Sequence, residues 1–110
     1  MAVTKLADRQ LLTPPSAGGG ITRNIFPIST TTTGATTTSV DYVYIANGTF
    51  TYTQPTAIGN TNRYTIKNAG IGIITIVFTT GQNADDSTTI TLKPGFALDF
   101  ISNNVNWIII

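Results

Sequence analysis

Short stretches in which apolar and polar residues alternate, separated by turn-forming residues, constrain the fold of this chain most strongly. They run through residues 40–110, where, for example, Phe50 and Tyr52 alternate with threonines, and Leu98 and Phe100 alternate with Ala97 and other residues. A period of two is typical of a strand with one buried face. Strands repeated at intervals of about 8–12 residues are typical of a small β-sandwich or barrel.

The residues between these stretches predict tight turns. Asn47-Gly48 lies between two alternating stretches, and Asn-Gly is the strongest short signal for a β-hairpin. Lys93-Pro94-Gly95 fits a type II turn, with proline at its second and glycine at its third position. The sequence therefore predicts an all-β fold, a small antiparallel β-sandwich or barrel with an extended N-terminal arm.

The composition excludes several classes of function. The 110 residues carry a net charge of +1, and their six Lys and Arg residues are scattered, unlike the clustered basic surface that binds nucleic acid. No apolar run approaches the roughly 20 residues that span a bilayer, and the first residues lack the apolar core of a secretion signal. We therefore expect a soluble protein made in a cytoplasm, without nucleic-acid or membrane partners.

Candidate catalytic residues are few. The chain has no His, Cys or Glu, which excludes histidine-based catalysis and thiolate chemistry. A polysaccharide-degrading enzyme would have to use its five aspartates alone. Asp85 and Asp86 are adjacent, and we interpret them as solvated turn residues in preference to Ca²⁺ ligands, which alternate along a loop. The sequence predicts no catalytic, cofactor or metal site, and hence no enzyme.

Composition divides the chain into three parts. Residues 1–28 are predicted to be an arm that anchors the protein to a partner, because they contain apolar side chains that a solvated tail would not need. Residues 29–39 are nearly pure threonine and are interpreted as an extended linker. Residues 40–110 are the predicted β domain. The apolar side chains of the arm are Leu6, Leu11, Leu12, Ile21, Ile25 and Phe26.

The last residues predict self-association. Trp107, Ile108, Ile109 and Ile110 are apolar on both faces of a strand, and such a strand needs cover on both sides. A domain of about 70 residues without metal or disulfide also gains stability from oligomerisation. We therefore expect a homo-oligomer with these four residues at the subunit interface.

Two stretches resemble a module found in tail-fibre, head-fibre and capsid-decoration proteins of tailed bacteriophages. They are residues 50–76 and 87–110, where Tyr64-Thr65-Ile66-Lys67-Asn68 and Asn106-Trp107-Ile108-Ile109 match the module's motifs closely. The chain departs from the module in two turns, where Ala84-Asp85-Asp86 replaces Ile-Asp-Gly and Asn103-Asn104-Val105 replaces Asp-Gly-Thr.

The resemblance implies a homotrimeric β module exposed on a virion. A short chain with one arm and one module suits a capsid decoration or head-fibre protein, whose partner is the major capsid protein or another virion protein. The alternative is a tail-fibre or adhesin tip whose Asn- and Thr-rich loops bind host-surface glycan. Under either hypothesis the protein is structural, requires no cofactor and is located in the virion.

Overall fold

The computed structural model of the chain describes residues 22–37 and 40–110, which contain nine strands and no helix. The predicted all-β character is confirmed. The strands are β1 (Thr22–Ile28), β2 (Thr32–Thr33), β3 (Val40–Ala46), β4 (Phe50–Gln54), β5 (Arg63–Asn68), β6 (Ile74–Phe78), β7 (Thr89–Leu92), β8 (Ala97–Ser102) and β9 (Trp107–Ile109).

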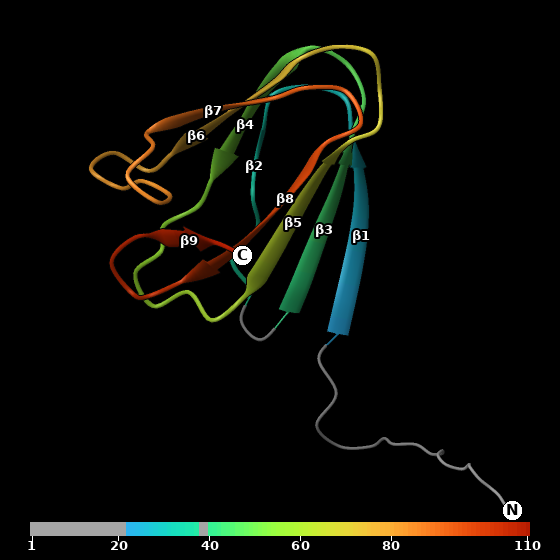
Figure 1. The fold of residues 1–110 in the computed structure, drawn as a ribbon. Coiled ribbons are helices and arrows are strands. Elements are labelled where there is room, and N and C mark those ends of the chain that lie inside the picture. The colour runs from blue at the N-terminus through green and yellow to red at the C-terminus, as the bar shows by residue number, and fades with distance from the viewer. Residues whose placement is uncertain (1–21, 38–39) are drawn as a thin grey trace, which may run out of the picture.

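Two sheets form the fold, one with the strand order β1-β3-β5-β8-β9 and the other with the order β2-β4-β6-β7. The first six strands alternate between the sheets, so that β1, β3 and β5 lie parallel in one sheet and β2, β4 and β6 lie parallel in the other. Figure 1 shows β1, β3 and β5 side by side and pointing the same way. The chain thus winds between two sheets, as in a parallel β-helix.

The last three strands reverse this direction. β7 pairs antiparallel with β6, β8 with β5, and β9 with β8. Between β7 and β8, the backbone N–H of Phe96 donates to the carbonyl of Lys93 over 3.1 Å, and Gly95 has a φ of 86°. This is the geometry of the type II turn that the sequence predicted.

The predicted antiparallel pairing is therefore wrong for the first six strands, and the sheets do not close into a barrel. Asn47-Gly48 is not a hairpin turn, because β3 and β4 belong to different sheets. Glycine supplies the φ of 134° at Gly48, and the N–H of Asn47 donates to the carbonyl of Ile28, the last residue of β1. Apolar and polar residues alternate with a period of two in parallel and antiparallel strands alike, so the alternation could not distinguish the two kinds of pairing.

The sheets also begin before Val40, where the sequence predicted the β domain to start. Residues 22–28, assigned to the arm, form β1 and pair with β3 along its whole length. Thr32 and Thr33, assigned to the linker, form β2 and pair with β4. Threonine is compatible with a strand at this place, because β-branched residues favour the pleated surface of a sheet.

The core lies between the two sheets and is rich in aromatic rings. Tyr42 stacks on Tyr64 with ring centroids 5.4 Å apart, and Tyr64 meets Trp107 edge to face at 5.2 Å. A Cβ at Gly34 would collide with the hydroxyl of Tyr52, so this position has room for glycine alone. The buried apolar residues are Val40, Tyr42, Tyr44, Ala46, Tyr52, Ala57, Tyr64, Ile66, Ile74, Ile76, Ala84, Leu92, Phe100 and Trp107.

Candidate interaction surface

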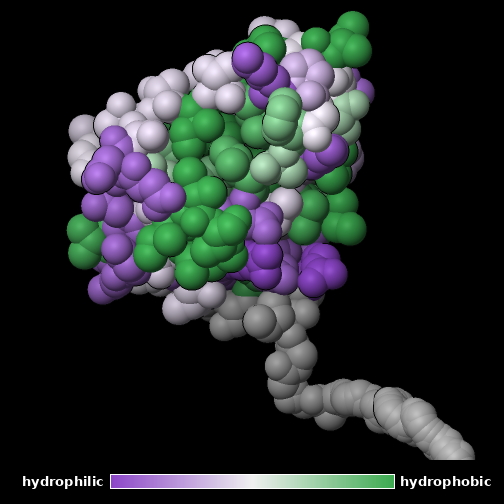
Figure 2. Space-filling model, viewed as in Figure 1, coloured by the Kyte–Doolittle hydropathy of each residue, from purple (hydrophilic) through white to green (hydrophobic). Residues whose placement is uncertain are grey.

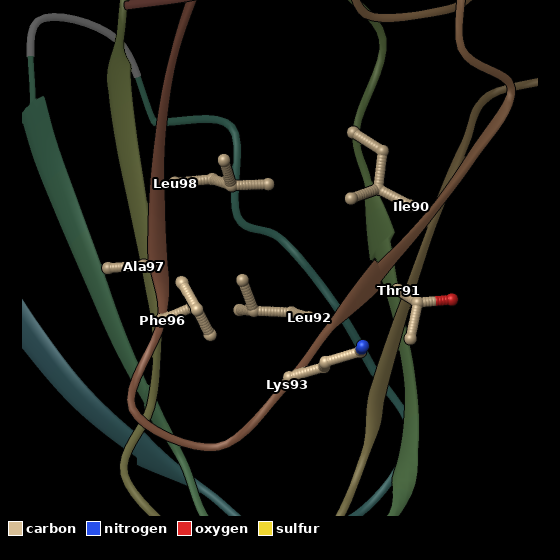
Figure 3. Close-up of a pocket in the computed structure, with 7 residues that line it drawn as sticks. All are labelled: Ile90, Thr91, Leu92, Lys93, Phe96, Ala97 and Leu98. Carbon is tan, nitrogen blue, oxygen red and sulfur yellow. The ribbon is translucent and has the colours of Figure 1, made fainter.

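An apolar groove of about 240 Å³ lies between β7 and β8. Figure 3 shows the side chains of Ile90, Leu92, Phe96 and Leu98 pointing toward one another across it, whereas Thr91 and Ala97 point away. Lys93 is the charged residue in its lining. We call this feature the β7–β8 groove.

The groove exists because β7 is the edge strand of the four-stranded sheet. Inward-facing side chains at an edge have no further strand to cover them. Leu92 is buried and Ile90 and Leu98 are half-buried, but Phe96 is 63% exposed. Figure 2, which views the same side as Figure 1, shows apolar residues gathered in the middle of this face. These exposed apolar side chains make the groove a candidate interaction surface.

The C-terminal strand β9 borders the same face. Trp107 is buried, and its indole N–H donates to the carbonyl of Pro55 over 3.0 Å. Ile109 is half-buried, whereas Ile108 is 36% and Ile110 57% exposed. The chain's own core therefore covers one side of the segment and leaves Ile108 and Ile110 open. Their place at a subunit interface stays a prediction.

The predicted anchoring residues are divided by the structure. Leu6, Leu11, Leu12 and Ile21 lie outside the described residues. Ile25 and Phe26 lie in β1, where Ile25 points outward and Phe26 stacks on Tyr42 and Tyr44 with centroid distances of 6.0 and 5.7 Å. Phe26 thus contributes to the edge of the core, a role that the sequence analysis missed.

Charged side chains of neighbouring strands form ion pairs on the five-stranded sheet. Arg63 donates to Asp99 over 2.6 Å, and the hydroxyl of Thr65 donates to the other oxygen of Asp99, also over 2.6 Å. Burial opposes ionisation of Asp99, but these two hydrogen bonds and the charge of Arg63 together lower its pKa below the ordinary value of 3.8. Arg23 and Asp41 form a second pair at 3.5 Å.

Asp85 and Asp86 lie in the loop before β7 and both have positive φ, 46° and 69°. A carboxylate oxygen of Asp85 accepts the backbone N–H of Ile109 over 3.3 Å, which ties the loop to β9. Among the described residues, no group of three or more acidic, His or Cys side chains is placed to hold a metal ion. No helix in the described part of the chain could cross a membrane.

Most aromatic residues of the strands belong to the core. Tyr42, Tyr44, Tyr52, Tyr64 and Trp107 are buried, and Phe50 packs against the core from a half-buried position. Burial raises the pKa of the Tyr44, Tyr52 and Tyr64 hydroxyls. These rings therefore serve packing inside the fold.

The sequence analysis recognised the alternation of Leu98 and Phe100 in β8 but predicted no groove beside it. The groove depends on the position of β7 at the edge of its sheet, which period-two alternation does not encode. In comparisons with known proteins, no family model, curated protein or solved structure matches this chain.

Proposed function

We propose that this chain is a non-enzymatic structural protein of a bacteriophage virion, a capsid decoration or head-fibre protein that assembles as a homotrimer. The observation that carries the proposal is the uncovered apolar surface of β7, β8 and β9. These strands coincide with residues 87–110, one of the two stretches that resemble the phage module. Apolar surface on the strands of that motif is what a self-associating module requires.

Attachment to the particle is assigned to residues 1–21. Residues 22–28 are left out of this assignment, because β1 pairs with β3 and is part of the sheet. Three arms on one trimer would bind symmetric capsid sites with an avidity far above the affinity of one arm. The partner under this proposal is the major capsid protein or another virion protein.

Co-sedimentation with phage particles that lack the protein tests this function. We expect the full chain to bind at saturating, symmetric sites, and a variant without residues 2–21 to keep its oligomeric mass but lose binding. The variant Ile71→Ser is the control, because Ile71 is 97% exposed in a loop and lies outside both the arm and the groove. Particle binding that survives the truncation would refute the role of the arm.

The alternative, a tail-fibre tip that binds host glycan, is favoured by one feature. The loops around Gly59 and Asn104 are joined by a hydrogen bond of 2.6 Å from the Gly59 N–H to the Asn104 side chain. They present exposed asparagines such as Asn103 on a fixed backbone. Binding of the purified chain to a glycan array, abolished by Asn103→Ala with Asn104→Ala, would support this function and not the decoration role.

A further inference from the structure

A positive charge lines the β7–β8 groove, and a negative charge lies in the loop that precedes β7. Lys93 directly follows β7, and Asp86 lies in the loop that precedes it. Between these two residues, β7 has four residues and spans roughly 13 Å at about 3.3 Å per residue. The four inward side chains between them are uncharged: Ile90, Leu92, Phe96 and Leu98.

Neither charge has a partner within the described part of the chain. Arg63 pairs with Asp99, Arg23 pairs with Asp41, and Lys67 donates to the carbonyl of Gly95 over 2.8 Å. Lys93 and Asp86, in contrast, make no ion pair with any described residue. A charge at each end of an apolar strip is a pattern that a second copy of the same surface can match.

We propose that the β7–β8 groove is the contact between copies of this chain, joined head to tail in a closed ring of three. Lys93 of each copy lies against Asp86 of the next, and the groove side chains are buried between them. This inference rests on the proposed homotrimer and adds the surface and the orientation of its contact.

The charges distinguish two arrangements of three copies. Three copies with their grooves parallel along a threefold axis would bring three Lys93 side chains together at one end and three Asp86 side chains together at the other. Like charges at close range are unfavourable. A head-to-tail contact places unlike charges opposite each other, and such heterologous contacts close into rings when the rotation permits.

Native mass spectrometry and light scattering of the full chain test the groove. Phe96→Ser removes an apolar side chain that is 63% exposed, so its fold should survive. We expect at least a tenfold weaker trimer, with Ile71→Ser unchanged as the control. An unaltered trimer in Phe96→Ser would overturn the groove as interface and leave the homotrimer itself intact. A monomeric wild type would refute both.

Charge reversal tests the orientation. We expect Lys93→Asp and Asp86→Lys each to weaken the trimer about five- to tenfold, and the double variant Lys93→Asp/Asp86→Lys to restore it. The unlike charges then face each other again with reversed signs. Equal weakening in the double variant would overturn the pairing.

An equimolar mixture of the two single variants separates a ring of three from a pair. In an isologous pair, one copy of each variant satisfies both charge contacts, and the mixture regains full association. A ring of three contains an odd number of copies, so one of its contacts always joins like charges. We therefore expect incomplete rescue in the mixture, and full rescue as a dimer would overturn the ring.

Discussion

Hydrogen bonds between buried side chains fix single residues inside the core. Tyr52 and Gln54 lie two positions apart on β4, both fully buried, and the Tyr52 hydroxyl donates to the Gln54 side-chain oxygen over 2.8 Å. The side-chain nitrogen of Gln54 has no hydrogen-bond partner among the described residues. An apolar core therefore contains one polar pair that depends on both members.

We predict strong coupling between these two residues. Tyr52→Phe leaves the Gln54 oxygen without its donor, and Gln54→Met leaves the Tyr52 hydroxyl without its acceptor. Each should lower the free energy of unfolding by about 1–3 kcal/mol, because a buried polar group is then unpaired. The double variant should cost clearly less than the sum. Urea unfolding of the four proteins measures the coupling, and additive losses would contradict it.

The need for glycine at position 34 could not be predicted from the sequence, because it arises from contacts with residues distant in the chain. Its Cβ position would collide with the Tyr52 hydroxyl and approach Pro55 Cδ to 2.7 Å. We predict that Gly34→Ala lowers stability by about 1–3 kcal/mol, the usual cost of overpacking. Thr37→Ala, at an exposed position in the same segment, is the control and should change stability little. Equal melting temperatures of the two variants would contradict the close approach.

At the scale of elements, β1 is a strand of the fold, although the sequence analysis assigned its residues to the arm. Phe26→Ala should lower the free energy of unfolding by about 1–2 kcal/mol, because the ring is partly exposed but stacks on two core tyrosines. Ile25→Ala, next to it and facing solvent, should be nearly neutral. The difference in urea midpoint between the two variants is the measurement, and equal midpoints would place β1 outside the cooperative fold.

The pairing of β5 with β8 predicts a pH dependence. The pKa of Asp99 is lowered in the folded state, so the unfolded chain binds more protons in acid. The stabilisation is fully present above the ordinary carboxyl range and is lost as the pH falls from about 4 through the folded value. Asp99→Asn should therefore flatten the dependence of unfolding free energy on pH below 4, and Thr65→Val should flatten it partly. Parallel curves for wild type and Asp99→Asn would contradict this.

The strands themselves could be predicted from the sequence much better than their partners could. Phe50 and Tyr52 on β4, and Leu98 and Phe100 on β8, face inward as alternation indicates. Alternation reports which face is buried, and it is identical for parallel and antiparallel neighbours. Pairing is decided by long-range contacts such as those of β1 with β3, 18 residues apart in register, and these leave no local signal.

At the scale of the whole molecule, the β7–β8 groove results from the change from parallel to antiparallel strands near the C-terminus. The antiparallel strands β7, β8 and β9 close the C-terminal side only partly, and the groove is what they leave open. The apolar segment Trp107–Ile110 was predictable because four consecutive apolar residues can be recognised in the sequence alone. The groove was not, since it depends on β7 lying at an edge. Self-association is the whole-molecule property that would cover both features.

Alkaline stability tests the assembled core as a unit. The pKa values of Tyr44, Tyr52 and Tyr64 are raised by burial, so the folded state holds these protons more tightly than the unfolded chain does. The stability they contribute is fully present below pH 10, the ordinary value, and is lost as the pH rises toward their folded pKa values. We predict that the free energy of unfolding falls increasingly steeply between pH 9.5 and 11.5, on the order of 1.4 kcal/mol per pH unit for each proton released.

Tyr52→Phe removes one of these protons and should reduce the slope, although it is less stable than wild type at pH 7. Repeating the urea titrations over a range of protein concentrations separates a loss of core stability from a loss of self-association, because only self-association depends on concentration. A slope in Tyr52→Phe equal to that of wild type, at every concentration, would mean that folding does not raise the pKa of Tyr52 and would contradict this prediction.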